Sequence, residues 1–220
     1  YGAVWKVQPN GGGLKRISAQ QGHYIEPAFS NDGKTIDYRR IGGDGLRGNL
    51  YSKERGVYRI PSDGGKATLV TEEGSSPAFN KTNDRIFLLT NEGEKTALIS
   101  VGLNGEQRRI HLLSDNAEQI IPSPDENWVA ITERFNAYIG VFPKTGQAVN
   151  IGPATSDYPV KRVTRDAGYN LNWSTDSKKL YWSLGPELFS RNLTNTFKFV
   201  EGAPDSINEK PDTAGINIGF

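Results

Sequence analysis

A short phrase of polar turn residues recurs four times along the 220-residue chain, each time between two apolar runs. Consecutive copies begin 50, 43 and 51 positions apart. A period of about 40 to 50 residues is typical of one four-stranded blade in a β-propeller. The copies are Ser30-Asn31-Asp32-Gly33-Lys34, Asn80-Lys81-Thr82-Asn83-Asp84, Ser123-Pro124-Asp125-Glu126-Asn127 and Ser174-Thr175-Asp176-Ser177-Lys178.

Each copy joins runs with alternating apolar residues, which predicts a β-hairpin. A second hairpin is predicted after each copy, because strand-like runs flank short turn dipeptides. Two hairpins per period make a four-stranded antiparallel blade. Helical periodicity is not sustained, so we expect almost no helix. The turn dipeptides are Asp63-Gly64, Asn104-Gly105, Thr145-Gly146 and, as a weaker signal, Thr194-Asn195.

The fourth residue of each phrase indicates the turn geometry. Gly33 and Asn83 stand where a tight turn requires positive φ, which these residue types tolerate. Glu126 and Ser177 occupy the same place in the third and fourth copies and tolerate it less well. We therefore expect a different geometry in the third and fourth turns.

The repeats divide the chain into an all-β array. Residues 1–18 predict an outer half-blade, because Val4-Trp5-Lys6-Val7 and Leu14-Lys15-Arg16-Ile17 flank a turn at Asn10-Gly11. Pro204, Pro211 and Gly215 interrupt the last twenty residues, so 201–220 is expected to be a linker toward a following domain. Four blades and a half do not close a ring, which predicts a part of a larger propeller. The four complete blades are expected at about 24–71, 75–111, 118–152 and 168–200.

Charge and composition exclude several classes of function. Lys and Arg number 26 against 25 for Asp and Glu, and a net charge of +1 gives no long-range field that would gather nucleic acid or anionic lipid. The chain has no apolar stretch of the length that a membrane helix needs. It also lacks cysteine, which excludes disulfides, thiol catalysis and cysteine-bound zinc. We expect neither nucleic acid nor membrane as a partner.

The repeat resembles that of TolB-type propellers, which also occurs in tricorn-like and prolyl-oligopeptidase-like proteins. The stretch from about 127 to 193 is similar to the last propeller blades of large bacterial proteins in which a metal-dependent amidohydrolase domain follows the propeller. Pro122 and Glu126 depart from the pattern of the third phrase. The segments that carry this resemblance are Thr132-Glu133-Arg134-Phe135-Asn136-Ala137-Tyr138, Val160-Lys161-Arg162-Val163-Thr164-Arg165-Asp166-Ala167-Gly168 and Tyr181-Trp182-Ser183-Leu184-Gly185-Pro186-Glu187-Leu188.

The resemblance implies a non-catalytic module in a periplasmic or secreted hydrolase. The catalytic domain, with a divalent metal, would follow residue 220, and the propeller would pack on it and control substrate access. The residues of this chain agree with a non-catalytic role, because an amidohydrolase centre needs several histidines and only His23 and His111 are present. Two alternatives stay open: a TolB-like module that binds another protein, and the gating propeller of a prolyl-oligopeptidase-like peptidase. No Gly-x-Ser-x-Gly motif of such a peptidase occurs in the chain.

A glycine-rich segment matches a dinucleotide-binding fingerprint by its letters alone. Gly43-Asp44-Gly45-Leu46-Arg47-Gly48 would need a helix directly after it, because helix N-terminal amides hold the pyrophosphate. Strand-like residues follow instead. The segment is expected to be a loop between strands, with no cofactor bound.

The loops that enter the innermost strands are the expected functional surface, because such loops meet at one mouth of a propeller channel. Their acidic residues could hold a cation there or could be ordinary solvated charges, and Arg165 with Asp166 could form a local ion pair. His23 could act as an acid or base or as a surface residue. No catalytic or metal-ligating residue is assigned. The candidates for the channel mouth are His23, Glu26, Glu73, Glu118, Arg165, Asp166 and Tyr169.

Overall fold

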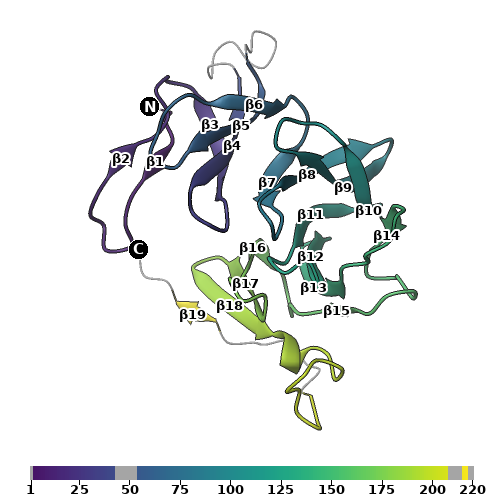
Figure 1. The fold of residues 1–220 in the computed structure, drawn as a ribbon. Coiled ribbons are helices and arrows are strands. Elements are labelled where there is room, and N and C mark those ends of the chain that lie inside the picture. Colours follow the sequence, from purple (N-terminus) through teal and green to yellow (C-terminus); the bar gives the residue numbers. More distant parts are fainter. Residues whose placement is uncertain (1, 43–53, 208–214, 218–220) are drawn as a thin grey trace. The chain divides into compact units, whose positions relative to one another are not determined.

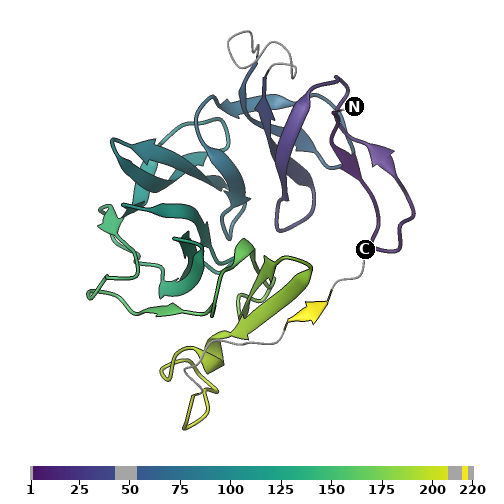
Figure 2. The same ribbon diagram turned by 180° about the vertical axis from the view of Figure 1, so that it is seen from behind.

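The computed structural model describes residues 2–42, 54–207 and 215–217 and is built from β-strands (Figure 1; Figure 2). The glycine-rich segment 43–48 lies outside the described residues. The chain forms two compact units, residues 1–90 with 99–109 and residues 91–98 with 110–220. Each unit is described separately.

The first unit opens with a two-stranded hairpin of β1 (Trp5–Lys6) and β2 (Lys15–Arg16). A four-stranded antiparallel sheet follows, and its strands lie in chain order. Strands β7 (Ser75–Phe79) and β8 (Arg85–Glu92) then form the next antiparallel pair. The strands of the four-stranded sheet are β3 (His23–Phe29), β4 (Thr35–Ile41), β5 (Gly56–Pro61) and β6 (Thr68–Thr71).

Strands β7 and β8 belong to a sheet with the order β14-β10-β9-β8-β7. It includes β9 (Lys95–Gly102), β10 (Arg109–Ser114) and β14 (Val149–Asn150). The boundary between the two units falls within this sheet.

The second unit contains two further four-stranded sheets, of order β11-β12-β13-β15 and β16-β17-β18-β19. The all-β prediction is therefore confirmed. Each of the four repeats contributes the strands of one propeller blade. The helical element of the described residues is η2 (Leu193–Asn195), a single 3-10 turn. The strands are β11 (Ala117–Pro122), β12 (Trp128–Glu133), β13 (Asn136–Val141), β15 (Val160–Arg162), β16 (Tyr169–Trp173), β17 (Lys179–Leu184), β18 (Glu187–Asn192) and β19 (Ile216–Asn217).

The third repeat does not end at the expected residue 152, because Thr145-Gly146 does not form the turn of its second hairpin. Pro143 follows β13 almost directly and has no N–H for a ladder hydrogen bond. The chain leaves the sheet there, and β14 pairs in parallel with β10 of the preceding repeat, where the Ile151 N–H donates to the Leu113 carbonyl at 2.8 Å. The fourth strand of the sheet is β15, which pairs with β13.

The fourth repeat also ends later than the expected residue 200. The predicted turn at Thr194-Asn195 lies in η2, which ends β18 because Leu193 and Phe197 are buried in the core. The Arg191 guanidinium donates to the Asn195 carbonyl at 2.6 Å and holds this turn. The fourth strand is β19, which lies in the segment expected to be a linker and pairs with β18.

The repeated phrase is a turn closed by the side chain of its first residue. In the first copy, the Ser30 hydroxyl accepts the Thr35 N–H at 3.0 Å and donates to the Asp32 carboxylate at 2.6 Å. Ser174 makes the same two bonds, to the Lys179 N–H at 2.9 Å and to Asp176 at 2.6 Å. The bond from the serine lowers the pKa of both aspartates.

The other two copies keep this arrangement. The Ser123 hydroxyl accepts the Trp128 N–H at 3.0 Å. In the second copy, Asn80 replaces serine, and its side-chain oxygen accepts the N–H groups of Asp84 and Arg85 at 3.0 and 2.9 Å. A short polar acceptor at the first position therefore satisfies turn N–H groups that have no ladder partner.

The expectation of a different geometry in the third and fourth turns is wrong. The fourth residue has positive φ in all four copies, 70° at Gly33, 58° at Asn83, 58° at Glu126 and 61° at Ser177. The common cause is a hydrogen bond from the N–H of this residue to the carbonyl of the first residue, at 2.8 to 3.1 Å. The turn closes in the same way whichever side chain stands there.

The positive-φ residue can also link neighbouring turns. The Asn83 side-chain oxygen accepts the Asn31 N–H of the first turn at 2.8 Å. In the second unit, the Ser177 hydroxyl accepts the Asp125 N–H of the third turn at 2.9 Å. Each bond joins residues about fifty positions apart, so a polar residue here gains a contact that glycine cannot make.

We predict that Asn83→Ala lowers the free energy of unfolding by about 1–2 kcal/mol, because alanine strains the positive φ and loses the bond to Asn31. Asn83→Gly should cost less, since glycine loses the bond and relieves the strain. Urea unfolding of both variants measures the difference. Equal losses for alanine and glycine would contradict this assignment.

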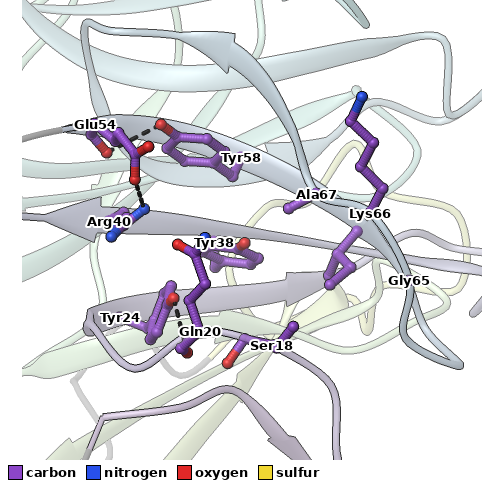
Figure 3. A pocket seen from close by; sticks show the side chains of 12 residues that line it. Ser18, Gln20, Tyr24, Tyr38, Arg40, Glu54, Tyr58, Gly65, Lys66 and Ala67 are labelled. Carbon is purple, nitrogen blue, oxygen red and sulfur yellow. Dashed lines mark hydrogen bonds and ion pairs between the residues drawn. The ribbon is translucent and has the colours of Figure 1, made fainter.

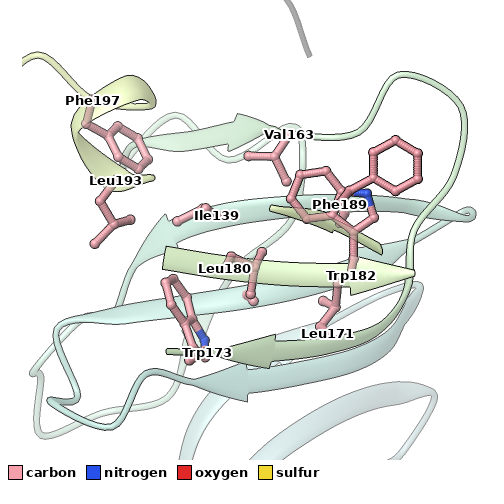
Figure 4. Close-up of a cluster of buried hydrophobic side chains, with 11 residues drawn as sticks. Ile139, Val163, Leu171, Trp173, Leu180, Trp182, Phe189, Leu193 and Phe197 are labelled. Carbon is pink, nitrogen blue, oxygen red and sulfur yellow. The ribbon is translucent and has the colours of Figure 1, made fainter. Parts of the chain in front are cut away.

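The core of the second unit lies between its two four-stranded sheets and η2 (Figure 4). Ile139 and Val163 face Leu180 and Trp182 there, and η2 and the residues after it add Leu193 and Phe197. The Trp182 ring stacks on Phe189 with centroids 5.9 Å apart. The Trp173 indole N–H donates to the Ile121 carbonyl at 3.1 Å, so its polar edge is satisfied within the core.

A buried ion pair lies in the first unit, between β4 and β5. The fully buried Asp37 carboxylate accepts bonds from two nitrogens of the Arg59 guanidinium, at 3.1 and 3.3 Å. Arg59 also donates to the Leu103 carbonyl at 3.2 Å and lies 5.4 Å from the centre of the Phe79 ring. Burial raises the pKa of Asp37 to about 6, and the positive charge of Arg59 opposes that rise.

We predict that Asp37→Asn lowers the free energy of unfolding by about 3 kcal/mol, because the Arg59 side chain, only 14% exposed, is left without its counter-charge. Asp63→Asn is the control, since the pair of Asp63 with Lys6 is exposed and should contribute no measurable stability. Both are compared by urea unfolding. If Asp37→Asn lowers the free energy of unfolding no more than Asp63→Asn does, the Asp37–Arg59 pair does not contribute to stability.

Candidate functional site

A cavity of about 330 Å³ in the first unit is lined by three tyrosines (Figure 3). Tyr24, Tyr38 and Tyr58 come from the adjacent strands β3, β4 and β5. The strand register explains their meeting, because Tyr38 lies directly opposite Tyr58. The loop after β2, with Ser18 and Gln20, closes the other side.

The rings form a continuous aromatic wall. Tyr24 meets Tyr38 edge to face, with centroids 5.2 Å apart and planes at 84°. Tyr38 and Tyr58 are nearly parallel, with centroids 6.0 Å apart. Such offset and edge-to-face contacts stabilise aromatic pairs beyond their buried area.

The polar groups around the rings are held by neighbouring residues. Arg40 lies opposite Tyr24, with its guanidinium 5.9 Å from the ring centre, and pairs with Glu54. The Tyr58 hydroxyl donates to the Glu54 carbonyl at 3.0 Å, and the Tyr24 hydroxyl donates to the Gln20 carbonyl at 3.1 Å. The cavity therefore offers aromatic faces beside a neutralised charge pair, a chemistry suited to holding a flat or apolar group.

Burial raises the pKa of Tyr38 to about 12, the neighbouring Tyr24 adds to the rise, and Arg40 opposes it. Burial likewise raises the pKa of Tyr58. Both rings therefore stay neutral through the physiological range.

Glu26, a predicted channel-mouth residue, is a structural contact. It lies in a bulge of β3 with φ of 54°, just before Pro27. Its carboxylate accepts the Ser76 N–H at 2.6 Å and pairs with Arg39 at 3.2 Å. Ser76 has φ of 52° in the equivalent bulge of β7, so the side chain of one bulge binds the backbone of the next.

The other two candidates of the first unit differ in their contacts. Glu73 pairs with Arg108 at 2.8 Å. His23 begins β3 and is exposed.

Of the four predicted channel-mouth residues in the second unit, two form an ion pair and two are exposed. Arg165 and Asp166 pair with each other at 2.7 Å, so the ion-pair alternative is confirmed. Glu118, on β11, and Tyr169, at the start of β16, are exposed. Across the described residues, no group of three or more His, Asp or Glu is close enough to hold a metal ion.

The tyrosine cavity was missed in the sequence, although a signal for it exists. Tyr38 and Arg40 are two positions apart and so share one face of their strand. The pairing of β4 with β5 places Tyr58 opposite Tyr38, whereas Tyr24 reaches the same face only through the bulge between Ile25 and Ala28, which shifts the register that the first phrase sets.

We predict that alkaline pH destabilises the first unit through Tyr38. Its folded pKa, about 12, lies above the value of about 10 for an unfolded tyrosine, so its contribution is complete below pH 10 and is lost as the pH rises toward 12. Tyr38→Phe should flatten the fall of unfolding free energy over that interval. Tyr181→Phe, in the other unit, is the control and should leave this fall of unfolding free energy unchanged. The assignment would be refuted if the free energy fell equally in wild type and in Tyr38→Phe.

Comparisons with known proteins identify the fold. No protein-family model and no curated protein sequence matches the chain. Among solved structures, TolB from Acinetobacter baumannii matches with a TM-score of 0.63 and 16% identity over 87% of this chain and 46% of that one. The chain thus spans less than half of that TolB.

Two further structures agree. A protein described as TolB from Agrobacterium tumefaciens has a TM-score of 0.62 and 10% identity, over 87% of this chain and 70% of that one. A gluconolactonase from Xanthomonas campestris has a TM-score of 0.60 and 13% identity, over 86% of this chain and 64% of that one. Within the described residues, no helix is long and apolar enough to cross a bilayer. The chain has the fold of a TolB-like β-propeller.

Proposed function

We propose that the chain is a non-catalytic propeller module of a larger amidohydrolase-like hydrolase and acts by packing on a neighbouring protein domain. The divalent metal would belong to that catalytic domain, and the module would control access of substrate to it. A periplasmic or secreted location goes with this proposal. Its support is the TolB-like fold together with the resemblance of the segment from 127 to 193 to the propellers of such hydrolases.

The observation that carries the packing role is the outward face of the N-terminal hairpin. Trp5, Val7 and Leu14 are 53%, 53% and 67% exposed. Trp5 and Val7 alternate along β1 and its continuation, and the pairing of Trp5 with Arg16 places Leu14 on the same face. A group of large apolar side chains held in this way marks a surface that contacts another protein.

The opposite face of the hairpin is already used. Val4 and Ile17 are buried against Ile36, Tyr38 and Ile60 of the adjoining sheet. The hairpin is therefore held firmly while its other face stays available, as a docking element requires.

The test compares the native polypeptide that carries this sequence with the 220-residue chain. We expect an intact mass several times 24.2 kDa, and slower hydroxyl-radical labelling of Trp5 and Leu14 in the native polypeptide. Phe199, exposed in the second unit, is the control residue. A mass of 24.2 kDa, or equal labelling of Trp5 in the two samples, would contradict the proposal.

A TolB-like module that binds a separate protein is the second candidate, favoured by the structural likeness to TolB. The same surface would serve it. The domain content of the native polypeptide distinguishes the two candidate functions. A hydrolase domain should be present if the first is correct and absent if the second is correct.

A further inference from the structure

We propose that a second cavity, in the unit formed by residues 91–98 and 110–220, binds a small molecule through a primary ammonium group. The cavity has a volume of about 500 Å³. It lies where the β10–β11 turn, the β12–β13 turn and the segment after β14 meet. The proposal does not depend on the packing role of the N-terminal hairpin.

The first observation is an orphaned hydroxyl. Ser114, at the end of β10, lines the cavity and is only 2% exposed. Its Oγ has no hydrogen-bond partner among the described residues. Leaving a buried polar group unbonded costs about 1–3 kcal/mol, so a ligand that bonds it would gain affinity.

The second observation is a buried carboxylate. Glu133, the last residue of β12, lines the same cavity and is 9% exposed. Within the described part of the chain, its carboxylate makes no hydrogen bond or ion pair. Gly152 lies against it, because a Cβ there would be 3.3 Å from Oε2. Buried charges in proteins are normally paired, so the site lacks a cation.

The neighbouring charges do not supply this cation. Lys95 pairs with Asp115 at 3.1 Å and donates to Asn150 at 2.8 Å. Arg134 follows Glu133 and lines the cavity, but no ion pair joins the two side chains. Glu133 is therefore the unneutralised carboxylate of the site.

The turn that carries Glu133 is strained. Arg134 and Phe135 both have positive φ, 47° and 70°, in a two-residue hairpin turn where asparagine and glycine are usual. Non-glycine residues in this conformation cost about 1–3 kcal/mol each and are concentrated at functional sites. The segment 132–138, which the sequence analysis named for its resemblance to other propellers, thus contains both the strain and the unpaired charge.

A primary ammonium group fits these features. It brings one positive charge for Glu133 and three N–H donors, so it also has a donor to offer the hydroxyl of Ser114, which lines the same cavity. A metal ion fits poorly, because the described residues offer no group of three ligands. The volume suits a small organic molecule, and the half-buried Tyr138 gives its hydrocarbon part an aromatic wall.

The experiment titrates the 220-residue chain with n-butylammonium and, separately, with n-butanol, and follows backbone amide NMR shifts of Ser114, Glu133 and Gly152. We expect saturable shifts with n-butylammonium and at least tenfold weaker binding of the uncharged n-butanol. Glu133→Gln should weaken n-butylammonium binding about tenfold or more. Glu118→Gln removes an exposed carboxylate of the neighbouring strand and should leave binding unchanged.

A thermal melt separates a binding role from a structural one. Glu133→Gln should not lower the Tm, because it removes a buried charge without a partner. Ser114→Ala should keep the Tm and weaken binding several-fold. The proposal is overturned if wild type shows no saturable shifts, if Glu133→Gln binds n-butylammonium as wild type does, or if Glu133→Gln melts at a clearly lower temperature.

Discussion

One hydrogen bond recurs in every repeat and sets the geometry of its hairpin: the side chain of Ser30, Asn80, Ser123 or Ser174 accepts a backbone N–H from the strand that follows. The bond closes a turn that the ladder alone would leave with unsatisfied donors. Once the turn is closed, the register of the two strands is fixed, and so is the face on which each side chain lies. The buried Asp37–Arg59 pair and the Tyr38–Tyr58 stack lie in the next register, between β4 and β5, and Tyr24 joins them through the bulge of β3.

The part of the fold that depends on such local bonds could be predicted from the sequence. The phrase and its hairpin are encoded within about ten neighbouring residues, and the four copies correspond to the four larger sheets of the described residues. The two turns predicted at Thr145-Gly146 and Thr194-Asn195 are wrong because distant contacts decide those segments. β14 pairs with a strand of the preceding repeat, and η2 forms because Leu193 and Phe197 are buried.

The candidate site could be predicted less well for the same reason. Glu26 was predicted as a channel-mouth residue, but its partner Ser76 lies fifty residues later, so this contact was not visible in the sequence. Glu133 lay within a segment recognised as distinctive, although burial without a partner is a property of the folded chain alone. Positive φ at Glu126 and Ser177 shows that a closing backbone bond can override a residue's own preference.

The two cavities differ in what the fold leaves unsatisfied. Around the tyrosine cavity, Arg40 and the tyrosine hydroxyls of Tyr24 and Tyr58 have partners. Around the second cavity, the Ser114 hydroxyl and the Glu133 carboxylate have no partner among the residues that the structure describes. A propeller scaffold is shared by proteins of unrelated activity, so function must be argued from such sites and not from the fold.

Native-state hydrogen exchange tests most directly whether the four side-chain-closed turns determine the fold. The amides of Thr35, Arg85, Trp128 and Lys179 each donate to the first residue of their turn. The account predicts that all four exchange far more slowly than in an unstructured peptide, and that Ser30→Ala accelerates exchange at Thr35 while leaving Lys179 unchanged. Exchange of these amides at the rate of an unstructured peptide would contradict it.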